Sequence, residues 1–293
     1  MKAFFAAVTL FAVSAVTSAQ KNIVLLDADD RTPVAFAVVR QGEAGVYSDG
    51  NGMFETKTFN DGNPVEISMM GYETRRFKIG SADTIYLKAV AINLPEVEVT
   101  SAKRELLVIN PPATARLIGD WPLGVGTETF AVIIPRKQER KLLKLSIPFL
   151  KPRDRDMKRF EGSPVIRVNI YEVEGAGKGA RIYSGTAKPI GNPKRSFLEI
   201  DLENEGIYLG LNGLCVGVEM VGNIRPDGTL AEDEYYLSPC LTGKKNKDFK
   251  ISTYFKIVFY SDKPIPITKF INDHMPPGVV VSERNLSIGM VLR

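Results

Sequence analysis

Cysteine, histidine and tryptophan are scarce in this chain of 293 residues, which contains two cysteines, one histidine and one tryptophan. A closed Cys/His zinc site needs four such ligands, so the sequence predicts no metal site of that kind. The single imidazole, His274, lies in a proline-containing segment with no Gly-x-Ser-x-Gly elbow and no Cys/His pattern beside it. We therefore predict no catalytic residue, no metal ligand and no cofactor.

Long hydrophobic runs and a strong excess of one charge are missing as well. After residue 20 no apolar run approaches the ~18 residues that a membrane-spanning helix requires. The formal net charge of +4 is small for this length and does not favour nucleic acid, which calls for a strongly basic domain. The sequence thus predicts neither a transmembrane span nor a nucleic-acid partner.

Residues 1–19 have the pattern of an export signal. Lys2 supplies the positive start, AFFAAVTLFAVSAV the apolar part, and TSA before Gln20 a small-residue cleavage site. We expect the protein to be exported and to be periplasmic, outer-membrane-associated or secreted.

Export raises the question of a disulfide between Cys215 and Cys240. Cys215 lies in the strand-like GLCVGVEMV and Cys240 in the turn-like LSPCLTG. In an oxidising compartment the pair can close a loop worth about 3 kcal/mol. Two separate buried thiols are the alternative, because cysteine packs like a small hydrophobic residue. Both interpretations stay open at this point.

Nearly every periodic segment after the signal alternates like a β-strand, with turn residues every eight to twelve positions. This pattern predicts an all-β protein of two sandwiches. We expect a small sandwich over residues 20–100, a connector rich in proline over 101–124, and a jelly-roll-like sandwich over 125–293.

One turn-like segment, VYSDGNGMFE, has the oxygen-bearing residues of a cation loop. An EF-hand loop needs oxygen ligands at alternate positions and an acid at the twelfth, whereas Met53 is fifth and Asn60 twelfth counting from Asp49. We instead expect a hairpin turn with positive φ at Gly50 and Gly52.

The first sandwich resembles the carboxypeptidase regulatory-like domain of exported Bacteroidota proteins. The segments that carry the resemblance are RTPVAFAVV, GVYSDGNGMFE, VEISMMGYETRRFKI, DTIYLKA and LPEVEVTSA. The resemblance implies a transthyretin-like sandwich of seven strands that packs or binds and does no chemistry. The second sandwich looks like the C-terminal domain of small secreted proteins that carry this front module, and that resemblance implies no activity.

Two further patterns resemble catalytic motifs and have simpler interpretations. The glycine-rich EGAGKGARIY lacks the Ser/Thr and the helix of a phosphate-binding loop, so we expect a hairpin there. In EIDLENE the acids Glu199, Asp201 and Glu203 alternate with apolar residues, so we expect them on the solvent face of a strand rather than in a pair of catalytic carboxylates.

A basic run from Arg136 to Arg159 is the clearest charge feature of the sequence. Clustered cations attract anionic groups, such as lipopolysaccharide phosphates or acidic glycans, although a solvated strand face and a charged loop would give the same pattern. The candidate binding residues are Arg136, Lys137, Arg140, Lys141, Lys151, Arg153, Arg155, Lys158 and Arg159.

Together these patterns predict a non-catalytic binding protein of the cell envelope. The front sandwich would make protein contacts, and the second would bind a surface partner, an envelope protein or a surface glycan such as lipopolysaccharide. A carbohydrate-binding jelly roll is the alternative, with Tyr235 and Tyr236 as stacking residues. A glycan hydrolase that uses acids of the second sandwich is a further alternative.

Overall fold

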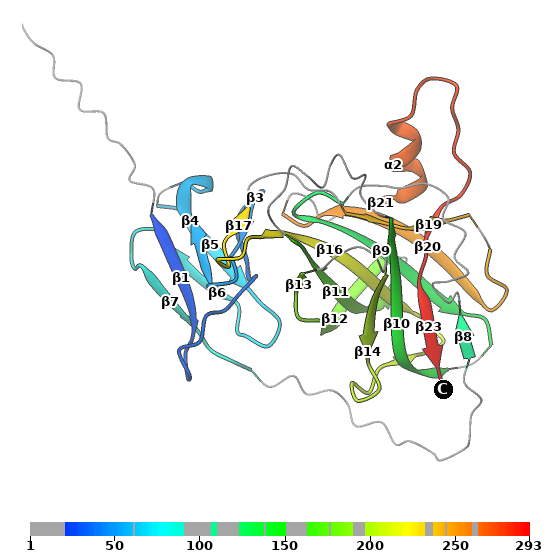
Figure 1. Ribbon diagram of the computed structural model, residues 1–293, viewed down its shortest axis with the longest axis horizontal. Helices are drawn as coiled ribbons and strands as arrows, with labels where there is room; N and C mark the ends of the chain where they lie inside the picture. The colour runs from blue at the N-terminus through cyan, green and yellow to red at the C-terminus, as the bar shows by residue number, and fades with distance from the viewer. Residues whose placement is uncertain are drawn as a thin grey trace, which may run out of the picture.

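The computed structural model describes residues 21–60, 62–90, 107–109, 123–137, 139–150, 163–175, 177–189, 197–231, 237–243, 245–259 and 263–293. Strands make up most of these residues and form two bodies, drawn in blue to cyan and in green to red in Figure 1. The predicted all-β sandwich architecture is confirmed. The segment expected to be an export signal lies outside the described residues.

The first body contains seven strands in two sheets, as predicted. A three-stranded sheet has the order β4-β1-β7, and a four-stranded sheet has the order β3-β2-β5-β6. The strands are β1 (Asn22–Asp27), β2 (Val38–Gln41), β3 (Ala44–Tyr47), β4 (Met53–Glu55), β5 (Pro64–Ser68), β6 (Arg75–Lys78) and β7 (Thr84–Leu87). Side chains at alternate positions, such as Ile23 and Leu25 of β1 and Val65 and Ile67 of β5, fill one core between the sheets.

Two details of the first body differ from the sequence prediction. The segment 48–52 is not a hairpin, because β3 pairs with β2 whereas β4 pairs with β1 in the other sheet. Gly52 has a φ of 74°, but Gly50 does not have the positive φ that we expected. Asp49 accepts hydrogen bonds from the amides of Asn51 (2.9 Å) and Met53 (2.8 Å), so its carboxylate closes the turn instead of binding a cation.

A single turn of 3₁₀-helix follows β4. The strand ends at Glu55, and η1 spans Thr56–Thr58. The amide of Thr56 donates to the carbonyl of Lys21, and the amide of Phe59 donates to the carbonyl of Thr56. The first bond continues the pairing of β4 with β1, and the second closes the turn of η1.

The second body is a sandwich of two antiparallel sheets. One sheet has the order β14-β10-β23-β8, with β15 and β18 also paired to β10. Its strands are β8 (Leu107–Ile109), β10 (Arg140–Leu150), β14 (Phe197–Asp201), β15 (Tyr208–Leu209), β18 (Ser238–Pro239) and β23 (Gly289–Leu292). β8 is a correction, because Leu107–Ile109 falls in the expected connector and instead pairs with β23 at the edge of the sheet.

The opposing sheet has the order β12-β11-β16-β9-β20-β21, with β13 paired to β11 and β17 to β16. Its strands are β9 (Thr127–Pro135), β11 (Ser163–Glu174), β12 (Gly177–Ser184), β13 (Lys188–Pro189), β16 (Leu214–Ile224), β17 (Leu230–Ala231), β20 (Phe249–Ile257) and β21 (Ile265–Pro266). The shorter elements β19 (Leu241–Thr242), β22 (Asn285–Leu286) and α2 (Ile267–Asp273) accompany this sandwich, and the core between the sheets includes Leu145, Ile166 and Val218.

Two local predictions for the second body are confirmed. The segment 174–183 is a hairpin, in which β11 and β12 pair around Gly175 with a φ of 59°. Glu199, Asp201 and Glu203 are exposed, whereas Leu202 is buried. Across the described part of the chain, no helix has the length and apolar character needed to cross a membrane.

Candidate interdomain site

The two sandwiches meet through a pair of turns. The turn 48–52, between β3 and β4, contacts the turn 225–229, between β16 and β17. The amide of Gly50 donates to the carbonyl of Gly228 (2.8 Å), and Nδ2 of Asn51 donates to the carbonyl of Asp227 (3.1 Å). A Cβ atom at Gly50 would lie 2.9 Å from the Gly228 carbonyl oxygen, so the close backbone approach requires glycine. Figure 1 shows β17, in yellow, beside β3 at this junction.

An apolar cluster lies next to these turns and joins both bodies. Phe36, Val38 and Tyr47 of the first sandwich pack with Val165 and Val221 of the second. Residues that are buried to this degree stabilise the contact by roughly 25 cal/mol for each Å² of apolar surface removed from water. The contact between the two bodies therefore includes a buried apolar cluster as well as the hydrogen bonds between the two turns.

The ring of Phe259 packs between the two bodies. A Cβ atom added to Gly45 would lie 2.2 Å from the Phe259 ring, and one added to Gly126 would lie 2.6 Å from it. The ring also contacts Tyr47, with centroids 5.0 Å apart. Glycine on each side of the ring allows the first sandwich to approach the second this closely.

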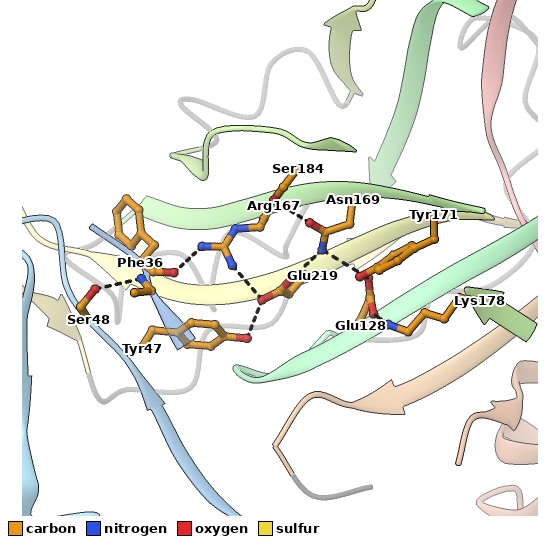
Figure 2. Close-up of polar contacts among 11 residues, drawn as sticks. Phe36, Tyr47, Ser48, Glu128, Arg167, Asn169, Tyr171, Lys178, Ser184 and Glu219 are labelled. Carbon is orange, nitrogen blue, oxygen red and sulfur yellow. Dashed lines mark hydrogen bonds and ion pairs between the residues drawn. The ribbon is translucent and has the colours of Figure 1, made fainter. Parts of the chain in front are cut away.

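A buried polar network continues the contact along the outer face of the eight-stranded sheet (Figure 2). Strand register places its central charges in one row: Arg167 of β11 lies opposite Glu219 of β16, which lies opposite Glu128 of β9. All three side chains are 2% exposed or less. Charged side chains are almost never buried so fully unless they are paired. The hydrogen-bond and ion-pair partners of these three residues therefore determine how their charges are compensated.

Glu219 receives three donors from the two bodies. The hydroxyl of Tyr47 donates to Oε1 (2.8 Å), and the guanidinium of Arg167 pairs with the same oxygen (3.3 Å). Nδ2 of Asn169 donates to Oε2 (2.7 Å). Tyr47 is the contribution of the first sandwich, so a buried carboxylate of the second sandwich is solvated by a side chain of the first.

Glu128 is held from the other side of the network. Lys178 of β12 forms an ion pair with its carboxylate, Tyr171 donates to Oε1 (2.7 Å), and Asn169 donates to the same oxygen (3.3 Å). Burial raises the pKa of Glu128, but Lys178 and Tyr171 outweigh burial and hold the pKa below its ordinary value. The carboxylate fills the space over Gly217, where a Cβ atom would lie 2.3 Å from Oε1.

Arg167 also reaches the backbone of the first sandwich. Its guanidinium donates to the carbonyl of Phe36, which has a φ of 60°. This left-handed conformation is strained for a bulky residue and costs on the order of 1–3 kcal/mol. Hydrogen bonding to a buried cation offsets that cost.

The two tyrosines act as neutral donors. Burial, followed by the charge of Glu219, raises the pKa of Tyr47 well above its ordinary value. Burial and Glu128 likewise raise the pKa of Tyr171. Both hydroxyls therefore stay protonated at neutral pH and serve as permanent hydrogen-bond donors.

The network has two neighbouring carboxylates, the kind of pair that a glycosidase uses, but both are held by neighbouring donors and cations. Glycoside hydrolysis needs one protonated carboxyl group to donate to the leaving group. Glu128 and Glu219 share the amide of Asn169, and each lies beside a cation, Lys178 or Arg167. The arrangement therefore favours holding the two bodies together over proton transfer. Within the described ranges, no three His, Cys, Asp or Glu side chains are grouped to hold a metal ion.

A cleft of about 610 Å³ lies at the junction, with walls from both bodies. Val46, Met53 and Lys57 contribute from the first sandwich, and Arg225 and Thr229 contribute from the second. The walls combine apolar side chains with both signs of charge. Concave sites of this size between domains are common ligand sites.

The structure describes four of the nine candidate residues of the basic run. Arg136 and Lys137 are exposed after β9, and Arg140 and Lys141 are half-buried at the start of β10. Arg136 lines a cavity of about 250 Å³ together with Lys245 and Lys250, which are distant in sequence. The other candidates, Lys151, Arg153, Arg155, Lys158 and Arg159, lie outside the described residues, so a continuous basic patch stays a prediction.

The two cysteines are buried thiols and do not form a disulfide. Cys215 packs with Phe130, Val132 and Tyr171 on the outer face of the eight-stranded sheet. Cys240 lies on the other sheet's side, where its amide donates to the carbonyl of Pro148 of β10. Of the two interpretations that the sequence left open, the structure has the separate thiols.

The sequence interpretation missed the residues of this network. One signal was available: Arg167, Asn169 and Tyr171 occupy alternate positions of a strand whose other positions are apolar. Such a strand is normally half exposed. Lys178 and Arg181 were considered only as part of a hairpin, and no local pattern connects them to Glu128.

No family model matches the chain, and no curated protein is similar enough in sequence to count as a relative. The fold and the geometry of the junction are therefore the basis for an assignment.

Proposed function

We propose that the protein is a non-catalytic binding protein of the cell envelope whose ligand lies in the cleft between its two sandwiches. The observation that carries this proposal is the cleft of about 610 Å³ to which both bodies contribute. Its partner would be an envelope protein or a surface glycan.

The local chemistry supports binding over catalysis. Nδ1 of His274 lies 2.7 Å from the carbonyl oxygen of Phe270, so this ring nitrogen is held by the backbone at the end of α2. The central carboxylates are held by cations and by neutral donors, as described above. A rigid, pre-organised junction lowers the entropy that a ligand loses on binding.

The resemblance of the first sandwich to carboxypeptidase regulatory-like domains supports an exported protein and a packing or binding role. Seven strands in two sheets are what this resemblance implies. In the described arrangement β2 and β3 contact the second sandwich, so protein contacts of the first sandwich would use its other strands. The ligand in the cleft, to which the second sandwich contributes Arg225 and Thr229, would be the surface partner or anionic glycan.

The experiment that tests the proposal combines a glycan array with a cross-linking pull-down from envelope extract. Each ligand found is then titrated against full-length wild type, Lys57→Glu and Arg225→Glu, which reverse charges in the cleft. Lys78→Glu, on exposed β6, is the matched control. We expect weaker binding by both cleft variants and unchanged binding by the control. Absence of any ligand, or equal binding by all four proteins, would refute the proposal.

The same array decides the carbohydrate-binding alternative, whose stacking residues Tyr235 and Tyr236 lie outside the described residues. A lipopolysaccharide co-sedimentation assay at low and high salt addresses the basic run. Charge reversal at Lys151, Arg153 and Arg155 should reduce sedimentation if that run binds phosphates.

A further inference from the structure

The cavity of about 250 Å³ that Arg136 lines is formed by residues of the second sandwich. Its walls come from the residue after β9, from β19 and the loop that follows it, from the start of β20, and from Glu283 and Asn285 at β22. It shares no lining residue with the interdomain cleft, so a ligand in one of the two sites leaves the other open.

Three cations line this cavity from three separate segments: Arg136 after β9, Lys245 between β19 and β20, and Lys250 in β20. The amide of Arg136 donates to the carbonyl of Asp248 (3.0 Å), which continues the ladder between β9 and β20 by one residue. In that ladder Ile134 lies opposite Lys250. Because side chains alternate along a strand, Arg136 and Lys250 project from the same face of the sheet.

The charges of these three side chains are not compensated within the described part of the chain, where none of them forms an ion pair. The one carboxylate that lines the cavity is Glu283, whose Oε1 lies 3.5 Å from Nδ2 of Asn285. Three positive charges and one negative charge leave an excess of two positive charges around the cavity. Like charges that face one hollow repel each other, and an anion in the hollow would remove this repulsion.

Asn246 adds a neutral donor to the same cavity. Its Oδ1 accepts hydrogen bonds from the amides of Asp248 (2.8 Å) and Phe249 (3.2 Å), so the backbone engages the oxygen of this side chain. The amide nitrogen Nδ2 is the part that remains to donate to a ligand. Phe249 is buried and forms an apolar wall together with Ile251. Cations and an amide donor beside an apolar wall are the elements of a site for an oxyanion on a small carrier.

We propose that this cavity binds the phosphate group of a small ligand among Arg136, Lys245 and Lys250. The excess of two positive charges matches a phosphate dianion better than a monovalent carboxylate. The planar fork of an arginine can donate two hydrogen bonds to phosphate, and the lysines act as point charges. The volume equals that of about eight water molecules, enough for a phosphate group with part of its carrier.

The test is calorimetric titration of the full chain with inorganic phosphate, glucose 6-phosphate and glucuronate at pH 7.5 and constant ionic strength, with chloride as the reference anion. We expect saturable binding of both phosphates and weaker binding of glucuronate. Lys245→Gln and Lys250→Gln should each weaken phosphate binding about 10-fold, the effect of losing one charge-assisted hydrogen bond. Glu283→Gln should tighten it, because the substitution removes a negative charge from the cavity. Tighter binding of glucose 6-phosphate than of inorganic phosphate would show that the carrier also contacts the walls.

Lys247→Gln is the matched control, because Lys247 is an exposed lysine of the same loop that does not line the cavity. It removes the same charge and should leave phosphate binding nearly unchanged, since salt screens exposed charges that do not contact the ligand. Arg225→Gln, in the interdomain cleft, should also leave phosphate binding unchanged, which separates this inference from the proposed function. Melting temperatures confirm that each variant is folded. No saturable binding of either phosphate, binding of glucuronate as tight as that of phosphate, or equal effects of Lys245→Gln, Lys250→Gln and Lys247→Gln would overturn the inference.

Discussion

The hydroxyl of Tyr47 lies 2.8 Å from Oε1 of Glu219, although the two residues are 172 positions apart and belong to different sandwiches. The bond is buried and continues through Arg167 and Asn169 into the second sandwich. It connects β3 of the first body to the row of buried charges on the second, and this bond is part of the contact that joins the two bodies.

Removal of this hydroxyl tests its energetic role. Tyr47→Phe keeps the ring against Phe259 but leaves Oε1 of Glu219 without one of its donors, which should lower the free energy of unfolding by about 1–3 kcal/mol. Urea denaturation followed by fluorescence and circular dichroism measures the change. Tyr86→Phe, in which the tyrosine is 39% exposed, is the control and should change stability by less than about 0.5 kcal/mol. Equal effects of the two substitutions would contradict the assignment.

A double-mutant cycle on Arg167 and Glu219 tests whether the buried pair acts as a unit. Arg167→Met and Glu219→Gln should each cost about 3–5 kcal/mol, because each leaves an uncompensated buried charge or donor set. The double variant should cost clearly less than the sum of the two. Additivity within about 0.5 kcal/mol would show that the residues do not interact.

Gly217 tests the position of the Glu128 carboxylate. Gly217→Ala places a methyl group 2.3 Å from Oε1 and must displace the carboxylate from Lys178 and Tyr171. We expect a loss of about 1–3 kcal/mol in thermal or urea unfolding. Gly177→Ala is the control, because the nearest atom to its added Cβ lies 4.0 Å away and its φ is not positive. A neutral Gly217→Ala would mean that the carboxylate lies elsewhere.

The pH dependence of stability should contain a contribution from Glu66. Hydrogen bonds from Arg76, followed by those from Arg40, outweigh the effect of burial and lower the pKa of Glu66 below its ordinary value of 4.5. The folded state therefore holds the ionised form more strongly than the unfolded state does. Its contribution is complete above pH ~4.5 and is lost as the pH falls through the lowered pKa.

Urea titrations of wild type and Glu66→Gln between pH 7 and pH 3 measure this contribution. The wild type should be more stable at pH 7, and its advantage should shrink as the pH falls below about 4.5. A difference between the two proteins that stays constant over the whole range would contradict the prediction.

The thiols of Cys215 and Cys240 should react only in the unfolded protein. Burial, together with the charge of Glu128, raises the pKa of the Cys215 thiol, so little thiolate is present near neutral pH. Titration with a thiol reagent, without reductant, should find two thiols in denaturant and almost none in the folded state. If denatured protein released no thiol, a disulfide would be present and the arrangement of the two cysteines would be wrong.

The sequence was sufficient for the fold because alternation of apolar residues is a local signal. Ile23 and Leu25, or Leu198 and Ile200, identify their strands without any knowledge of their partners. β8 was not predicted because it has only three residues and prolines follow it closely in the sequence. Its strand conformation depends on pairing with β23, which is distant in the sequence.

The site could not be predicted in the same way. Arg167 and Asn169 look like solvent-facing residues of a half-exposed strand, but Tyr47 and Phe36 of the first sandwich contact the network on that face. This contact depends on pairs more than 100 positions apart, for which a single sequence has no periodic signal. The basic run of 136–159 was the stronger local pattern, but a charge-rich segment carries no information about where it lies.

Differential scanning calorimetry of wild type, Tyr47→Phe and Glu219→Gln tests most directly the claim that the two sandwiches form one docked unit. Tyr47 belongs to the first body and Glu219 to the second. We predict one main unfolding transition, shifted to lower temperature by either substitution. Two separate transitions, with Tyr47→Phe moving only one and Glu219→Gln only the other, would contradict the account.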